Sequence, residues 1–280
     1  MTASTDMLMA LAPQVRDLLI TAADTLIVPR FQTLGDDDVR TKSSPTDLVT
    51  VADVQTEEWL TPRLLELLPG SVVVGEEGVA ADGRVLDHLE GDAPVWVVDP
   101  VDGTRNFAKG SDTFVTMLAL VQNGIPCFGM IWRPLKRELL WAVQGHGAWK
   151  EIQGAEPIKL KTRADVPPIH TLAGSVSFKW LDQDDQQRVR KNVDKVSMPK
   201  GLGCSGEEYA RLAEGRTDYA VFGLLNAWDH CPGLVIVREA GGIDALPSAA
   251  AYTTVARRER LLVAANQATM TAVRDTLFAD

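Results

Sequence analysis

The stretch WVVDPVDGTRNF, residues 96–107, runs from apolar residues into two aspartates that are three positions apart. Its apolar beginning is typical of a buried strand. Pro100 has no backbone N–H and a fixed φ, so we expect the strand to end there and the chain to turn. The turn would bring Asp99 and Asp102 to one side, where two carboxylates repel each other. A cation bound between them would remove this repulsion.

Gly103 and Thr104 follow the second aspartate directly. Their backbone N–H groups can cradle an anion, especially if a helix begins at Thr104. A polar turn at the end of a strand would explain the same residues, because Asp-Gly pairs are common in turns. Acidic clusters elsewhere in the chain favour the site over the plain turn.

Three further segments place acidic side chains at the ends of predicted strands or the starts of predicted helices. Each alone is a common cap or turn. Together they form a set of oxygen ligands without His or Cys, which indicates a hard cation, and Mg²⁺ suits a phosphate site better than Ca²⁺. The residues are Glu76 and Glu77 in VVVGEEGVA (72–80), Asp47 and Asp53 in TDLVTVAD (46–53), and Asp229, at an N-cap position, in NAWDHCPGLVIVREAGG (226–242).

The composition argues against several classes of protein. The chain has 280 residues, 45% of them hydrophobic, and a net charge of −10. Nucleic-acid surfaces need clustered Lys and Arg, so we expect no nucleic-acid partner. The short basic runs at 188–191 and 257–260 are interpreted as solvated helix faces.

Cysteine usage and the apolar runs bear on the compartment. The three cysteines are odd in number and widely spaced, which indicates buried thiols in a reduced environment. No run reaches the roughly eighteen apolar residues of a membrane span, and the N-terminus lacks a basic region before its apolar stretch. We therefore expect a cytoplasmic protein without a membrane partner.

Hydrophobic periodicity predicts an α+β first half followed by an α/β second half. Helices are predicted over 7–28 and after Asp53, with Pro62 as the place for a kink. The Pro- and charge-rich segment 153–168 is the predicted seam. It would join a half with most metal ligands, 1–152, to a half with Asp229 and the substrate-facing segments, 153–280. The other predicted elements are strands at 71–75, 95–99, 114–121, 125–132, 138–143, 171–175, 217–222 and 260–264, and helices at 183–192, 205–214, 230–240 and 267–278.

Residue spacing excludes several alternative sites. An EF-hand loop from Asp99 would need an oxygen ligand at position 101 and Glu at 110, where the chain has Val101 and Gly110. Phosphatases with an aspartyl-phosphate intermediate use Asp-x-Asp-Gly-Thr, and the extra residue here disfavours that mechanism. Neither a Gly-Lys-Ser/Thr phosphate loop nor a Gly-x-Ser-x-Gly elbow occurs. The histidines lack metal-ligand spacing, and His230 is interpreted as a helix-start residue.

The acidic segments, taken together, resemble the inositol monophosphatase family of Mg²⁺-dependent phosphatases. The resemblance spans residues 42–242 in order, and its Asp-Pro-x-Asp-Gly-Thr-x-Asn-Phe element is highly specific. It implies a five-layered αβαβα sandwich, usually a homodimer, that hydrolyses a small phosphorylated metabolite and is often inhibited by lithium. The segments are SSPTDLVTVAD (43–53), GEEG (75–78), WVVDPVDGTRNF (96–107) and WDHCPGLVIVREAGG (228–242).

The resemblance also implies a set of metal ligands. Glu76, Asp99 and the Val101 carbonyl would hold one Mg²⁺, while Asp99, Asp102 and Asp229 would hold a second. A pair of such ions can activate a water molecule and stabilise the leaving oxygen of a phosphate ester. The cations would also explain why these carboxylates tolerate one another.

The catalytic water and the phosphate have implied partners as well. Asp53 and Thr104 would orient the attacking water, because the hydroxyl of Thr104 can accept from the water while donating to Asp53. Glu76 would assist through a third, more weakly held ion. The backbone N–H groups of Gly103 and Thr104 would receive the phosphate.

The substrate is less defined than the chemistry. Relatives that act on inositol carry a glutamate seven residues before the last metal-binding aspartate, where this chain has Phe222, which cannot accept from a hydroxyl. Inositol-1-phosphate is the leading expectation. Histidinol phosphate, fructose 1,6-bisphosphate and nucleotide bisphosphates are the alternatives within the family. Substrate contacts are expected at Gly103, Thr104, Ser205, Phe222 and Asp229.

Two alternatives stay open at this point. The segment GLGCSGEEYARL (201–212) would begin a helix that faces the alcohol portion of the substrate, but Ser205 as a cap with Glu208 at the third helical position explains the same residues. An interaction protein with secondary phosphatase activity is the alternative function. All ligand positions are filled, which favours an enzyme.

Overall fold

The computed structural model describes residues 3–35, 38–41, 48–197 and 200–280. Its helices are α1 (Thr5–Ala22), α2 (Val51–Leu67), α3 (Glu76–Ala81), α4 (Thr104–Ala108), α5 (Gln183–Asn192), α6 (Ser205–Ala213), α7 (Ala227–Glu239) and α8 (Gln267–Leu277). Its strands are β1 (Val39–Thr41), β2 (Leu48–Thr50), β3 (Val72–Gly75), β4 (Val95–Asp102), β5 (Val115–Gln122), β6 (Ile125–Arg133), β7 (Glu138–Val143), β8 (Ala148–Ile152), β9 (Ile158–Lys159), β10 (Gly174–Val176), β11 (Tyr219–Phe222), β12 (Ile243–Ala245) and β13 (Leu261–Ala264).

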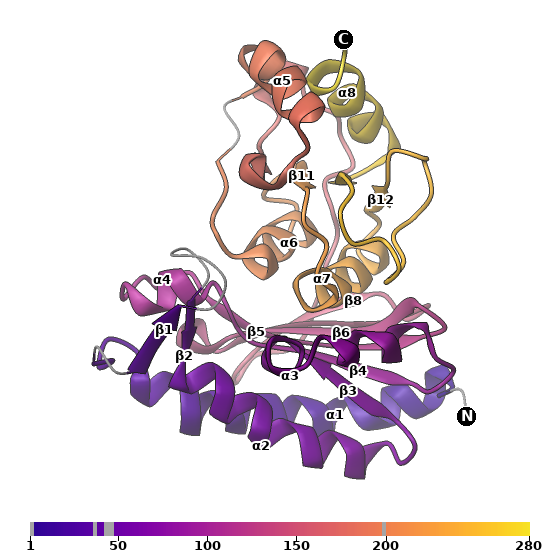
Figure 1. Ribbon diagram of the computed structural model, residues 1–280. Coiled ribbons are helices and arrows are strands. Elements are labelled where there is room, and N and C mark those ends of the chain that lie inside the picture. The colour runs from indigo at the N-terminus through magenta and orange to yellow at the C-terminus, as the bar shows by residue number, and fades with distance from the viewer. Residues whose placement is uncertain (1–2, 36–37, 42–47, 198–199) are drawn as a thin grey trace.

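These elements stack in five layers (Figure 1). Helices α1 and α2 form one outer layer and cover a sheet of order β3-β4-β5-β6-β7-β8-β9. Helices α6 and α7 lie between this sheet and a second sheet of order β10-β11-β13-β12, which α5 and α8 cover on the outside. This is the αβαβα sandwich that the resemblance implied.

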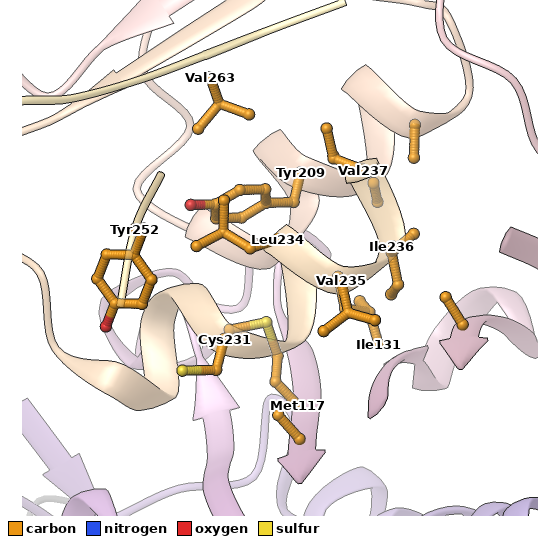
Figure 2. Packing of buried hydrophobic residues seen from close by; sticks show 14 of the residues in the cluster. Met117, Ile131, Tyr209, Cys231, Leu234, Val235, Ile236, Val237, Tyr252 and Val263 are labelled. Carbon is orange, nitrogen blue, oxygen red and sulfur yellow. The ribbon is translucent and has the colours of Figure 1, made fainter. Parts of the chain in front are cut away.

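The middle layer is packed from both sides, and Figure 2 shows apolar residues of α7 meeting Met117 and Ile131 of the first sheet and Val263 of the second. The contact with the first sheet is close. A Cβ atom on Gly129 of β6 would lie 2.4 Å from the carbonyl oxygen of Pro232 on α7. The approach of α7 carries Asp229, in its first turn, toward the end of β4.

The N-terminal helices begin and end at different residues from those predicted. The predicted helix 7–28 is an α-helix only to Ala22, and the chain continues in a π-helical turn, Ala23–Ile27, and a 3₁₀ turn, Val28–Arg30. Helix α2 begins before Asp53, not after it, because Thr50 and Asp53 cap each other reciprocally.

Strand β4 continues past Pro100, which corrects the expected end of the strand. Asp99 pairs with Met117 and Asp102 with Val115, so three steps along β4 match two steps along β5. The extra residue is a β-bulge, where a proline is tolerated because one backbone N–H is not needed in the ladder. Residues three apart in a regular strand point to opposite faces, and the bulge removes this difference.

Several short elements lie outside the predicted ones: β1, β8, β9, β12 and the short helix α3. Strand β9 falls within the segment 153–168 and pairs with β8, so part of the predicted seam belongs to the first sheet. The division into halves at residue 152 stays a prediction. Among the described residues, no helix combines the length and apolar character needed to cross a membrane.

Candidate active site

Three carboxylates meet at the end of β4 and the start of α7. Asp99, Asp102 and Asp229 each present an oxygen within 4.8 Å of the other two. Asp99 is 1% exposed, and its Oδ1 is buried without a hydrogen-bond partner among the residues that the structure describes. Burial, and then the negative charges of neighbouring carboxylates, raise the pKa of Asp99 well above its usual value. An unpartnered buried oxygen among like charges fits a bound cation, which would supply the missing contact and the opposite charge.

Asp102 is held by the first turn of α6. The backbone N–H of Gly206 donates to its Oδ2 at 2.6 Å, and that of Ser205 donates to its Oδ1 at 3.2 Å. Burial raises the pKa of Asp102, and these donors partly offset the effect. The N-cap of α6 is Cys204, so the alternative in which Ser205 caps the helix is wrong. Ser205 contributes its backbone to the site.

Glu76 begins α3, and its placement depends on a residue that the sequence patterns did not single out. Glu57, 7% exposed on α2, accepts from the backbone N–H of Glu77 at 2.8 Å and of Gly78 at 2.7 Å. A Cβ atom on Gly75 would lie 2.2 Å from the Glu57 carboxyl carbon, so only glycine allows this approach. The one available signal was that Glu57 follows Asp53 by one helical turn.

Asp53 is shared between two threonines. Its Oδ2 accepts from the backbone N–H of Thr50 at 2.8 Å and from the hydroxyl of Thr50. Its Oδ1 lies 3.3 Å from the hydroxyl of Thr104, which is also 2.9 Å from the carbonyl oxygen of Val101. A hydroxyl has one proton to donate. Thr104 therefore donates its proton either to Asp53 or to the carbonyl of Val101. Through this hydroxyl, Thr104 connects Asp53 with Val101, and all three are predicted site residues.

Asp229 is the third residue of α7, and Asn226 is the N-cap, which corrects the expectation that Asp229 caps this helix. The side-chain amide of Asn226 donates to Asp229 Oδ2 at 3.0 Å.

His230, the next residue, bonds to groups outside the aspartate cluster. Its Nδ1 lies 2.9 Å from the Tyr209 hydroxyl and its Nε2 lies 2.8 Å from the Leu224 carbonyl oxygen. Burial lowers the pKa of His230 to about 4, so the ring is neutral, donates to the carbonyl and accepts from the tyrosine.

Phe222 lies among aromatic side chains. Phe222 is 4% exposed, stacks on Tyr209 with ring centroids 5.1 Å apart and meets His230 edge-on. Its expected contact with substrate stays a prediction, and the side chain that would make this contact is buried.

Gly103, at the start of α4, has a φ of 90°, which favours glycine. A Cβ atom there would lie 2.9 Å from the carbonyl oxygen of Thr113.

The structure thus brings together Asp99, Asp102 and Asp229, and it connects Asp53, Thr104 and Val101 by hydrogen-bond distances. Glu76 is near enough for its charge to raise the pKa of Asp99. Asp47, from the same early segment, lies outside the described residues.

Comparison with known proteins identifies the family of the chain. The sequence profile of the inositol monophosphatase family matches residues 13–277. The chain belongs to the inositol monophosphatase family. Members of this family are phosphoric monoester hydrolases that depend on Mg²⁺ and act on small phosphorylated substrates, so the chain is an enzyme of that class.

The relatives of this inositol monophosphatase family member are named for different activities. Inositol-1-monophosphatase of Bacillus subtilis is 31% identical over 220 residues, which are 78% of this chain and 76% of that protein. Histidinol-phosphatase of Mycobacterium tuberculosis is 32% identical over 246 residues, 85% of each chain. The crystal structure of inositol monophosphatase II from Staphylococcus aureus matches with a TM-score of 0.74 at 27% identity and covers 96% of this chain and 93% of that one.

Proposed function

We propose that this phosphatase hydrolyses a small phosphorylated alcohol at the cluster of Asp99, Asp102 and Asp229. The observation that carries the proposal is the buried Oδ1 of Asp99, which has no hydrogen-bond partner in the described part of the chain and lies within a group of carboxylates whose oxygens are 4.8 Å or less apart. Without a counter-charge this arrangement is costly. A site that holds divalent cations and an anionic substrate makes the same arrangement useful.

The metal ligands follow from the same residues. Glu76, Asp99 and the carbonyl of Val101 would hold one Mg²⁺, and Asp99, Asp102 and Asp229 would hold the second, while Glu76 could assist a third. When bound, the cations neutralise the carboxylates and the phosphate and lower the pKa of a water molecule. The proximity of the three aspartates supports the second ligand set.

The protein's own groups then handle the water and the phosphate. The hydroxyl of Thr104 accepts from the attacking water and passes its own proton to Asp53, which lies 3.3 Å away. Thr50 holds Asp53 in place through two hydrogen bonds to Oδ2 and leaves Oδ1 to face Thr104. The backbone N–H groups of Gly103 and Thr104 bind the phosphate oxygens.

Inositol-1-phosphate is the first candidate substrate, in line with the Bacillus subtilis relative. Histidinol phosphate is the second candidate, because the relative with that name aligns over a larger share of both chains. The apolar Phe222 also favours a substrate without a ring hydroxyl at this position. Ser205, which lies beside the cluster, and Asp229, which belongs to it, face the alcohol portion in this proposal.

A phosphate-release screen tests the proposal. The purified chain is assayed with Mg²⁺ against inositol-1-phosphate, histidinol phosphate, fructose 1,6-bisphosphate and a nucleotide bisphosphate, with Asp99→Asn as the inactive control. Turnover of at least one substrate that requires Mg²⁺ and is lost in the variant supports the proposal. Absence of turnover with all of them, while the protein is folded, contradicts it.

The remaining expectations also stay proposals. They are a homodimeric, cytoplasmic enzyme that lithium inhibits and that has neither a nucleic-acid nor a membrane partner. Size-exclusion chromatography with light scattering tests the dimer, and a lithium titration of turnover tests inhibition. A monomer, or turnover that is insensitive to lithium, would contradict the respective proposal.

A further inference from the structure

Arg133, the last residue of β6, is 3% exposed and contacts three glutamates. Its Nη1 donates to Glu138 Oε2 and to Glu214 Oε1, both at 2.8 Å, and its Nη2 donates to Glu214 Oε2 at 3.1 Å. Its Nε donates to Glu207 Oε2 at 2.7 Å. Lys150 lies 2.9 Å from Glu214 Oε1 and 3.0 Å from Glu138 Oε1. The cluster joins the first sheet to α6.

Two carboxylates of this cluster, Glu138 and Glu214, have a pKa below the usual value because Arg133 and Lys150 lie beside them. Burial on its own would raise the pKa of Glu214, but hydrogen bonds and ion pairs with Arg133 and Lys150 hold that pKa at about 2. Arg133 contacts all three glutamates, whereas Lys150 contacts two. The guanidinium suits this position because its fork of donors serves several carboxylate oxygens at once, which a lysine ammonium cannot reproduce.

Two of the three glutamates lie at opposite ends of α6. Glu207 is in the first turn of this helix, and Glu214 is its C-cap. Glu207 directly follows Gly206, whose N–H donates to Asp102 at 2.6 Å. Arg133 therefore holds both ends of the helix that binds Asp102.

The first turn of α6 has little room to shift. A Cβ atom on Gly206 would lie 2.3 Å from Met117 Sδ and 2.6 Å from Val115 Cγ2, so the helix lies directly on β5. Asp102 and Val115 are paired residues of β4 and β5. A displacement of the first turn would therefore lengthen the hydrogen bonds to the Asp102 carboxylate.

We propose that Arg133 is a positioning residue for Asp102: it fixes α6 on the first sheet so that the N–H groups of Ser205 and Gly206 orient the carboxylate for the cation. The inference rests on the proposed metal site. It predicts that weakening the Arg133 contacts lowers Mg²⁺ affinity, although Arg133 does not itself contact the three aspartates.

Calorimetric Mg²⁺ titration of the full chain without substrate tests this. Arg133→Lys keeps the charge and loses the fork, and we expect its Kd for Mg²⁺ to rise about tenfold. Arg163→Lys is the matched control, because Arg163 lies 2.8 Å from the buried carboxylate of Asp218 in an ion pair that does not involve α6. Its Kd should stay within about twofold of the wild-type value.

Hydrogen exchange of the metal-free protein gives a second readout. In Arg133→Lys, the amides of the first turn of α6 should exchange faster than in the wild type, and those of α5 should not. Glu207→Gln removes the same ion pair from the helix side, and it decides the question if Arg133→Lys fails to fold.

The outcomes separate the two proposals. A wild-type chain that binds no Mg²⁺ overturns the proposed metal site, whereas a wild type that binds and an Arg133→Lys variant with unchanged Kd and unchanged exchange overturn the role of Arg133. A lower melting temperature with unchanged Kd also overturns it, because the cluster would then be structural only.

Discussion

Glu57 of α2 accepts the backbone N–H of Gly78 at 2.7 Å and thereby ties the start of α3 to α2. The same carboxylate accepts from Glu77 at 2.8 Å, so both of its oxygens are used. Glu76, the proposed metal ligand, precedes these two residues directly. The position of Glu76 therefore depends on a buried carboxylate from the helix that also carries Asp53.

Glu57→Gln tests this dependence. The amide nitrogen would face a backbone donor, so one hydrogen bond is lost and a buried donor is left unsatisfied, at a cost of about 1–3 kcal/mol in the free energy of unfolding. We expect a lower melting temperature and a higher Mg²⁺ concentration for half-maximal turnover. Glu58→Gln, the exposed neighbour on the same helix, is the control. Equal behaviour of the two variants would contradict the role of Glu57.

Asp99→Asn should separate stability from activity. The substitution replaces a buried carboxyl group, whose charged form burial and neighbouring carboxylates destabilise, with a neutral amide. In chelator we therefore expect the melting temperature to rise, by an amount equivalent to about 1–3 kcal/mol. Turnover should fall to background because a ligand of both proposed cations is lost. Asp87→Asn, at an exposed position, should change neither quantity. Normal turnover in Asp99→Asn would contradict the ligand assignment.

Metal removal should destabilise the wild-type protein. A ligand that binds only the folded state adds about 2.7 kcal/mol to the free energy of unfolding at a hundredfold excess over its Kd. We expect Mg²⁺ to raise the melting temperature relative to chelator, and Asp99→Asn to lose most of this difference. Identical melting curves of the wild type with and without Mg²⁺ would count against a bound ion.

Glu208 should make stability depend on pH. Burial is the main reason why its pKa is raised to about 7 from 4.5, despite donors from Leu202 and Ser175. The folded state therefore binds the Glu208 proton more tightly than the unfolded state does. The contribution of this proton to the free energy of unfolding is fully present below about pH 4.5 and is lost as the pH rises to about 7.

The shift of the Glu208 pKa from 4.5 to about 7 corresponds to about 3 kcal/mol in the free energy of unfolding, at about 1.36 kcal/mol for each pKa unit. The measurement is the free energy of unfolding in denaturant, in chelator, for wild type and Glu208→Gln between pH 4.5 and 7.5. The difference between the two proteins should change by this amount over that window. A constant difference would show that Glu208 titrates normally.

Phe222→Glu tests substrate discrimination. A carboxylate can accept from a ring hydroxyl, so we expect kcat/KM for inositol-1-phosphate, relative to an apolar alcohol phosphate, to rise about tenfold. The carboxylate would also replace a ring packed against Tyr209 and His230, so the folded fraction should fall. The ratio of the two substrates cancels that loss. Phe222→Leu is the control, and a ratio that is unchanged in both variants would place Phe222 outside the substrate site.

The sequence by itself determined the class of fold and which residue types gather at the proposed site. Asp99, Asp102 and Asp229 were identified because oxygen-only groups follow apolar strands or begin a helix, which are local patterns. The predicted ends of most strands lie within three residues of the observed ends. These predictions also rest on local patterns, because side-chain alternation and turn residues depend on neighbours in sequence. Short elements such as β9 and α3 were missed because few residues carry their periodicity.

Only the tertiary structure decided how the ligands meet. The bulge between Asp99 and Asp102 depends on the register with β5, and a register is a property of two strands rather than of one. The contacts of Glu57 with α3 and of Arg133 with α6 join segments far apart in sequence, where no spacing rule applies. A buried charge is stabilised by whichever groups the fold brings to it, so the residues that hold this site in shape become visible only when the layers are packed.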